Sequence, residues 1–286
     1  MRSKLFVPGS RPELFAKAFA SAADAISFDL EDAVAANRKE AAREAVRAML
    51  AGRPAVCRQT LIVRVNAITG GDFEADLLAV ARPDLDVLNI PKINGADDIR
   101  DVVAAVARLE RERGILRPIG ILANIETPRG LRNAAAIAAA DRRVIGLQLG
   151  FGDLFEPFGI ARREPAACNA VRLAVRFAAA EMAIPAYDGA FVDVADLAGF
   201  RAEAEEARRF GYAGKSCIHP RQIAPANAVF AATDEQVARA RRILAVAEEQ
   251  LAQGVGAFLL DGVMIDEPYI VQARAVVAQA DGGTHG

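Results

Sequence analysis

The sequence predicts an α/β protein built on an eight-stranded (β/α)8 barrel of the TIM type, followed by a C-terminal helical extension. Eight short apolar segments recur along the chain, spaced about one βα unit apart. Several are continuous runs, such as LIVRV and VIGLQL, as expected of parallel strands covered on both faces. The 286 residues also suit a barrel, which typically needs about 250. The predicted strands are residues 4–8, 25–29, 61–66, 87–91, 119–124, 144–149, 184–187 and 215–219.

Helical segments lie between the predicted strands and carry ordinary start and stop signals. Residues 39–50 alternate Glu and Arg around a stripe of Ala, Val and Leu, and the pattern ends before Gly52. Residues 195–210 present a charged face and end at Gly211. These patterns indicate amphipathic helices between the strands.

Two further segments, a helix and a tail, follow the eighth predicted strand. Thr233 and Gln236 form a capping-box pattern that opens a helix running to Gly254, and a tail over residues 263–280 follows it. A simple barrel does not need either segment. We therefore expect a barrel over residues 1–225 and an extension over residues 226–286 that serves for subunit contacts or as a lid.

Charge and composition argue against several classes of function. The 35 Lys and Arg residues nearly balance the 37 Asp and Glu residues, and a pI of 5.9 gives no electrostatic basis for nucleic-acid binding. Three widely spaced cysteines, Cys57, Cys168 and Cys217, predict free thiols in a reducing compartment. No apolar run approaches the roughly 20 residues of a membrane helix, and strand-like KLFVP at the start leaves no room for a secretion signal. We expect a cytoplasmic protein with no membrane partner.

Two carboxylates end adjacent predicted strands. Glu126 follows the fifth strand in IETPRG, and Asp153 follows the sixth in GFGDL, 27 residues later (153 minus 126). Because the carboxyl ends of parallel strands meet at one edge, both are expected at the barrel mouth, where active sites of this fold lie. Two carboxylates that leave room for water and a chelating substrate are typical of Mg²⁺ sites. Each alone is equally consistent with capping the following helix.

Other strand ends add charged side chains to the same mouth, among them Asp188 after the seventh strand. Glu31 and Asp32 follow the second strand and either hold metal-bound waters or cap the next helix. Arg64 in the third strand offers a bidentate fork for a substrate carboxylate or an oxyanion, and is also consistent with a structural ion pair. Lys92 after the fourth strand adds positive charge, as a satisfied rim charge rather than a Schiff-base lysine.

The motifs at these strand ends resemble a known family. Eight of them stand in the order found in the citrate lyase β-subunit-like branch of the HpcH/HpaI aldolase superfamily: LFVPGSRPELFAKA, SFDLEDAV, RVN, IPK, IETPRG, LGFGDL, GYAGKSCIHPRQI and DGVMIDEP. The resemblance spans about residues 2–277. It implies a TIM barrel with a C-terminal helical extension, usually assembled as a homotrimer.

This resemblance also implies a Mg²⁺-dependent carbon–carbon lyase. Such enzymes act on 3-hydroxyacyl thioesters such as malyl-, citramalyl- or citryl-CoA, which they cleave to a 2-keto acid and acetyl-CoA or form in reverse. Glu126 and Asp153 match the metal ligands, and Arg64 matches the residue that grips the keto-acid carboxylate and the thioester carbonyl. Glu31 and Asp32 match the acidic pair behind the metal-bound waters.

Three further residues are assigned through the resemblance. Asp266, in the motif Met264-Ile265-Asp266, matches an acid/base that the extension contributes, often across a subunit boundary. It is equally consistent with capping a helix that starts directly after it. Ser10 and Arg11 are the nearest candidates for contacts to the coenzyme A phosphates.

The chain departs from the family pattern at the border of the expected pocket. Asn89 stands where an aliphatic residue or Met is common, and Pro128 stands where Ala is frequent. Val263 replaces a frequently basic residue before Met264, which puts a phosphate contact there in doubt. Three alternatives stay open: a citrate lyase β subunit acting on an acyl-carrier-protein thioester, a malyl-CoA thioesterase, and a non-catalytic assembly subunit.

Overall fold

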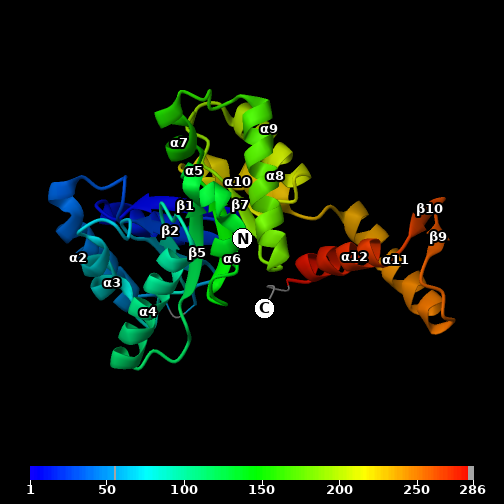
Figure 1. Cartoon of the computed structure of the whole chain (residues 1–286), viewed down its shortest axis with the longest axis horizontal. Coiled ribbons are helices and arrows are strands. Elements are labelled where there is room, and N and C mark those ends of the chain that lie inside the picture. The colour runs from blue at the N-terminus through cyan, green and yellow to red at the C-terminus, as the bar shows by residue number, and fades with distance from the viewer. Residues whose placement is uncertain (55, 283–286) are drawn as a thin grey trace. The chain divides into compact units, whose positions relative to one another are not determined.

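The computed structural model describes residues 1–54 and 56–282 and divides into two compact units, Met1–Phe230 and Ala231–Gly286 (Figure 1). The first unit is a closed barrel of eight parallel strands in which β8 pairs with β1, so the predicted fold class is confirmed. The expected boundary after residue 225 lies inside α10 (Ile223–Phe230), which belongs to the barrel unit. The strands are β1 (Ser3–Pro8), β2 (Ala25–Asp29), β3 (Thr60–Arg64), β4 (Val87–Ile90), β5 (Gly120–Ile125), β6 (Val144–Leu149), β7 (Ala186–Asp188) and β8 (Gly214–Cys217).

Helices surround the strands and bury one apolar face against them (Figure 1). In α2 (Lys39–Ala51) the buried apolar residues Ala42, Val46 and Leu50 follow the helical repeat, as the sequence pattern predicts. No described helix is long and apolar enough to cross a membrane. The other helices of this unit are α1 (Phe15–Phe19), α3 (Phe73–Val80), α4 (Ala96–Arg113), α5 (Pro128–Arg132), α6 (Ala134–Ala138), α7 (Phe151–Phe155), α8 (Pro165–Glu181) and α9 (Leu197–Arg209), with 3₁₀ turns η1 (Pro12–Leu14), η2 (Ala36–Arg38), η3 (Glu156–Phe158) and η4 (Pro220–Gln222).

The interior of the barrel is layered, because side chains two residues apart on a strand face the same side. The layer near the amino-terminal strand ends is apolar and consists of Ala25, Ile62, Val87, Leu122 and Tyr187. The next layer is buried and polar, and consists of Lys4, Ser27, Asn89, Asn124, Gln148 and Ser216. The layer at the carboxyl ends carries Asp29, Arg64 and Glu126. Polarity therefore rises along the barrel axis toward the end where a site is expected.

The second unit contains two helices and a short hairpin. The helices α11 (Asp234–Ala252) and α12 (Glu267–Ala280) pack against each other, and α11 begins at the predicted capping box of Thr233 and Gln236. The predicted helical extension is confirmed, and between its two helices lies a hairpin of β9 (Phe258–Leu260) and β10 (Val263–Ile265) that the sequence patterns did not predict. Its turn holds Asp261 and Gly262 at φ of 51° and 78°. An Asp-Gly pair with two positive φ angles is a strong hairpin signal, so this turn was readable in the sequence.

Candidate active site

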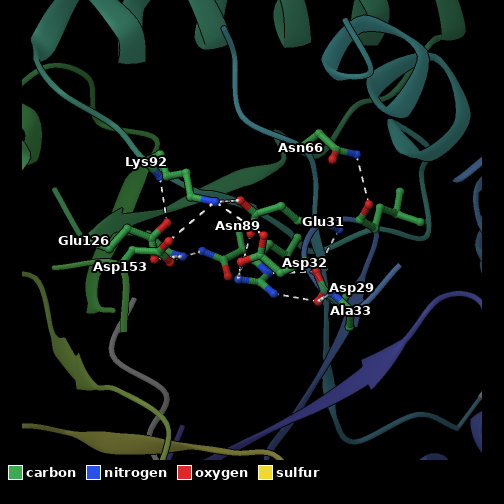
Figure 2. A network of polar contacts seen from close by, with 12 residues as sticks. Asp29, Glu31, Asp32, Ala33, Asn66, Asn89, Lys92, Glu126 and Asp153 are labelled. Atoms are coloured by element: carbon green, nitrogen blue, oxygen red, sulfur yellow. Dashed lines mark hydrogen bonds and ion pairs between the residues drawn. The ribbon is translucent and has the colours of Figure 1, made fainter. Parts of the chain in front are cut away.

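A cluster of charged side chains occupies the carboxyl ends of the strands (Figure 2). The structure brings six of the predicted site residues together there, from the segments that follow β2 to β6: Glu31, Asp32, Arg64, Lys92, Glu126 and Asp153. Asp29, at the end of β2, joins them. Most of these side chains are linked to one another by hydrogen bonds or ion pairs, so the cluster is one connected site.

Glu126 is almost fully enclosed, with 2% of its surface exposed. Its Oε1 accepts the backbone N–H of Lys92 at 2.8 Å, and its Oε2 accepts Asn124 Nδ2 at 3.2 Å. Burial and the neighbouring Glu31 charge raise the pKa of Glu126 to about 7. Thr127, not Glu126, caps α5 by accepting the N–H of Gly130, so the helix-capping interpretation of Glu126 is wrong.

Asp153 lies in the first turn of α7, on the more open side of the cluster. Its side chain is 40% exposed, and one carboxylate oxygen lies 3.7 Å from Lys92 Nζ. Its charge contributes to the raised pKa of Glu126, after burial and Glu31. The two carboxylates predicted from adjacent strands therefore face one space, as Figure 2 shows.

Glycine allows the close approach of Glu126 to the strand beside it. A Cβ atom on Gly150, directly after β6, would overlap both Oε2 and Cβ of Glu126. By contrast, a Cβ atom on Gly152, which lies two residues later inside α7, would meet nothing within 4 Å. The first glycine of GFGDL is thus required by the position of the Glu126 carboxylate.

Arg64 is held by a carboxylate that the sequence analysis did not assign to it. Its Nε and Nη2 donate to the two oxygens of Asp29 at 2.7 and 2.6 Å, and Asp29 sits opposite it in the strand register. The remaining nitrogen, Nη1, lies 2.8 Å from Glu31 Oε2. Asp29 also accepts the backbone N–H groups of Glu31 and Ala33. The bidentate fork is therefore occupied by Asp29, and only one edge of the guanidinium faces the mouth.

Lys92 places its ammonium group among three carboxylates. Its Nζ lies 2.7 Å from Glu31, 3.4 Å from Asp32 and 3.7 Å from Asp153. Its backbone has a φ of 54°, a conformation that L-residues rarely adopt, and this turn directs the N–H toward Glu126. The charge of Lys92 is therefore balanced by neighbouring carboxylates, as expected from the sequence.

The sum of these charges is negative. Five carboxylates, those of Asp29, Glu31, Asp32, Glu126 and Asp153, face two cations, those of Arg64 and Lys92, which leaves a formal charge of −3 (2 minus 5). A cleft of about 390 Å³ opens beside the cluster and is lined in part by Glu31, Asp32, Lys39, Asn66 and Lys92. The site thus combines excess negative charge with adjoining space for a small molecule.

Three predicted site residues belong to other segments of the chain. Ser10 and Arg11 follow β1, where Arg11 forms an exposed ion pair with Glu13, and no hydrogen bond or ion pair of the described residues joins their side chains to the cluster. Asp266 lies in the second unit as the N-cap residue of α12. Within the described chain its side chain makes no capping hydrogen bond, and its buried Oδ1 has no hydrogen-bond partner. The capping interpretation of Asp266 is therefore wrong.

Asp188 shows that a carboxylate at a strand end need not face the mouth. It ends β7, but its side chain points outward between the barrel and the helices, where Arg172 Nε donates to it at 3.1 Å and Lys215 pairs with it. Neighbouring Tyr187 faces the barrel interior instead. The predicted strand end is present, but the alternation of side chains removes Asp188 from the site.

Known proteins resemble this chain over almost its whole length. The family model described as HpcH/HpaI aldolase/citrate lyase matches residues 2–220. The citrate lyase subunit beta of Escherichia coli (strain K12) is 38% identical over 283 residues, which cover 98% of this chain and 93% of that protein. The L-malyl-CoA/beta-methylmalyl-CoA lyase of Cereibacter sphaeroides (strain ATCC 17025 / ATH 2.4.3) is 35% identical over 305 residues, covering 98% and 94%.

Solved structures give the same picture. CitE from Mycobacterium tuberculosis, in complex with magnesium, acetoacetate and coenzyme A, matches with a TM-score of 0.76 and 33% identity over 98% of this chain and all of that chain. The citrate lyase beta subunit of M. tuberculosis complexed with oxaloacetate and magnesium matches with a TM-score of 0.68 and 33% identity over 80% and 96%.

Proposed function

This chain belongs to the HpcH/HpaI aldolase/citrate lyase family of lyases, and on that premise we propose that it is a Mg²⁺-dependent lyase acting on a 3-hydroxyacyl-CoA thioester. The substrate would be of the malyl-, citramalyl- or citryl-CoA class, and the products a 2-keto acid and acetyl-CoA. One observation carries the proposal: Glu126 and Asp153, from adjacent strands, face one space at the barrel mouth beside Arg64.

The donor set suits Mg²⁺. Hard oxygen ligands are what this ion prefers, and two carboxylates leave coordination positions for water and a chelating substrate. Each oxygen of Glu126 receives one N–H group, so each keeps a lone pair for a cation. Among the described residues no group of three or more His, Cys, Asp or Glu forms a fuller cage. A divalent ion would offset most of the excess negative charge and relieve the repulsion that raises the pKa of Glu126.

The bound ion would supply Lewis acidity that lowers the pKa of the substrate hydroxyl group. The side chains would do the rest. Glu31 and Asp32 accept hydrogen bonds from water beside Glu126 and Asp153. The Nη1 edge of Arg64, which also pairs with Glu31, orients the carboxylate of the keto-acid part. Loss of the hydroxyl proton and scission of the bond between the second and third acyl carbons leave a keto acid and a thioester enolate.

Three further predicted residues complete the proposed reaction. Asp266 transfers a proton to the enolate carbon, or removes it in the condensation direction. Its side chain is not engaged in capping α12, which leaves it available for this role. Ser10 and Arg11, at the end of β1, would contact coenzyme A phosphates. We further propose a homotrimer in which Asp266 acts across a subunit boundary, as the family resemblance implies.

The test is an assay of the pure chain with Mg²⁺ and a panel of malyl-, citramalyl- and citryl-CoA, followed by product analysis. Keto acid and acetyl-CoA are the expected products. Glu126→Ala and Asp153→Ala should abolish cleavage while the circular dichroism spectrum stays that of the wild type. Glu181→Ala, which removes an exposed carboxylate at the end of α8, is the matched control. Unchanged turnover in either site variant would refute the metal assignment.

A second candidate is the β subunit of a multi-subunit citrate lyase that acts on an acyl-carrier-protein thioester. The 38% identity to the E. coli citrate lyase subunit beta favours it. Turnover of CoA thioesters by the purified chain alone would argue against this candidate. Release of a free hydroxy acid and coenzyme A would instead identify a thioesterase built on the same site.

A further inference from the structure

The barrel carries a polar layer directly below the charged cluster. Branched apolar side chains usually fill the inside of such a barrel, yet Lys4, Asn89 and Asn124 are buried here with 2%, 0% and 1% of their surfaces exposed. Buried polar groups are costly unless each is hydrogen-bonded. Each of these three side chains is indeed hydrogen-bonded.

These three side chains form one continuous chain of hydrogen bonds that ends on Glu126. Lys4 Nζ donates to Asn89 Oδ1 at 3.3 Å and also to Gln148 Oε1. Asn89 Nδ2 donates to Asn124 Oδ1 at 2.6 Å. Asn124 Nδ2 then donates to Glu126 Oε2 at 3.2 Å. The chain crosses the barrel from β1 through β4 and β5 to the mouth, and Figure 2 shows Asn89 with the cluster.

The chemistry of the two ends fixes the direction of every bond in this chain. An amine that donates to two amide oxygens turns the oxygen of Asn89 toward β1 and thereby its NH₂ group toward Asn124. The carbonyl of Leu122 accepts from the same NH₂ group at 3.0 Å and reinforces that orientation. Asn124 must then present its own NH₂ group to Glu126, whose carboxylate can only accept.

We propose that Lys4, Asn89 and Asn124 are positioning residues that form a relay orienting the Glu126 carboxylate toward the cation. The proposal rests on the proposed Mg²⁺ function of Glu126. The relay holds Oε2 from below, while the N–H of Lys92 holds Oε1 at 2.8 Å. Two donors on different oxygens fix the plane of the carboxylate, so its remaining lone pairs keep one direction. A side chain three hydrogen bonds away from the ligand would thereby affect cation affinity.

The relay does not depend on the charge of Lys4. Burial, with the Arg64 charge next in weight, holds the pKa of Lys4 well below its ordinary value. Donation to two amide oxygens needs only two protons, which a neutral amine also has.

Calorimetric titration with MgCl₂ alone tests the relay without any substrate. Asn124→Leu, which removes the donor to Glu126, should weaken Mg²⁺ binding about tenfold or more. Lys4→Met should weaken it in the same direction. The double variant Lys4→Met/Asn124→Leu should bind no more weakly than Asn124→Leu, because the relay is already cut there. Ser216→Ala, a buried substitution in the same polar layer, should bind Mg²⁺ like the wild type.

The outcomes separate the relay from a merely structural role. Wild-type affinity in Asn124→Leu, or effects of Lys4→Met and Asn124→Leu that multiply in the double variant, would overturn the relay while leaving the metal site intact. Absence of Mg²⁺ binding in the wild type would overturn the proposed function and the relay together. If Lys4→Met does not fold, the near-isosteric Asn89→Leu takes its place, alone and combined with Asn124→Leu. Its effect on Mg²⁺ affinity should likewise not add to that of Asn124→Leu.

Discussion

At the scale of single residues, burial decides the chemistry of the site. Glu126 is buried beside other carboxylates, which raises its pKa, whereas Asp29 is equally buried but has a guanidinium partner. Burial opposes ionisation of Asp29, but two hydrogen bonds from Arg64 and two from backbone N–H groups outweigh it and hold its pKa below the ordinary 3.8. Of these two buried carboxylates, Asp29 is therefore already paired with a cation, whereas Glu126 is not.

Asp29→Asn tests this pairing through the pH dependence of stability. A folded-state pKa below that of the unfolded chain contributes stability above about pH 4, and this contribution is lost as the pH falls through the folded-state pKa. We expect the variant to lose about 1.5–3 kcal/mol of unfolding free energy at pH 7. As the pH falls below about 4, its stability should decline less steeply than that of the wild type. Urea unfolding at several pH values measures both. Parallel curves for the two proteins would contradict the pairing.

At the scale of elements, the start of α7 and the end of β5 fit together only through a glycine. A methyl group on Gly150 would occupy the place of Glu126 Oε2. The constraint is steric and not conformational, because Gly150 has a φ of −125°, which other residues adopt readily.

Gly150→Ala should therefore weaken Mg²⁺ binding by about tenfold or more, because the carboxylate must move. Gly152→Ala is the matched control two residues away, where a methyl group meets nothing within 4 Å. Calorimetric titration of both variants decides the matter. Equal affinities in the two would show that Glu126 can shift without losing its function.

Element boundaries also show what the sequence could reveal. Strand ends located Glu126, Asp153, Glu31, Asp32 and Lys92 correctly, because a barrel gathers those ends at one mouth. The partners of these residues were less accessible. The pairing of Asp29 with Arg64 depends on strand register, and the outward direction of Asp188 depends on the parity of a three-residue strand.

The polar layer was also hidden from sequence reasoning. Asn89, Asn124 and Lys4 sit in otherwise apolar strands, and only the closed barrel brings β1, β4 and β5 to a common interior. Short strands likewise concealed the hairpin of the second unit, since three residues are too few for alternation to be visible. Its Asp261-Gly262 turn was the one available signal.

At the scale of the whole molecule, the chain divides the proposed chemistry between two units. The carboxylates proposed to bind Mg²⁺ belong to Met1–Phe230, and Asp266 belongs to Ala231–Gly286. A complete site then needs one barrel and one extension, which do not have to come from the same chain.

Subunit mixing tests this division. Glu126→Ala and Asp266→Ala should each be inactive alone. If Asp266 acts across a subunit boundary, the two variants refolded together should regain lyase activity, because some barrels with Glu126 intact will meet an extension with Asp266 intact. Each variant refolded alone is the control. A mixture that stays inactive although mass analysis shows mixed oligomers would place Asp266 in the site of its own chain.

The position of Lys92 has a consequence for ion discrimination. Its ammonium acts as a tethered counter-ion that is already present before any solute arrives. A potassium ion would bring the same single charge and must also shed its hydration shell, whereas a doubly charged ion adds attraction that the lysine cannot match. We expect the melting temperature of the wild type to rise with MgCl₂ and not with KCl of equal ionic strength. In Lys92→Met, KCl should also raise the melting temperature. If KCl raises it no more than in the wild type, Lys92 does not discriminate against potassium ions.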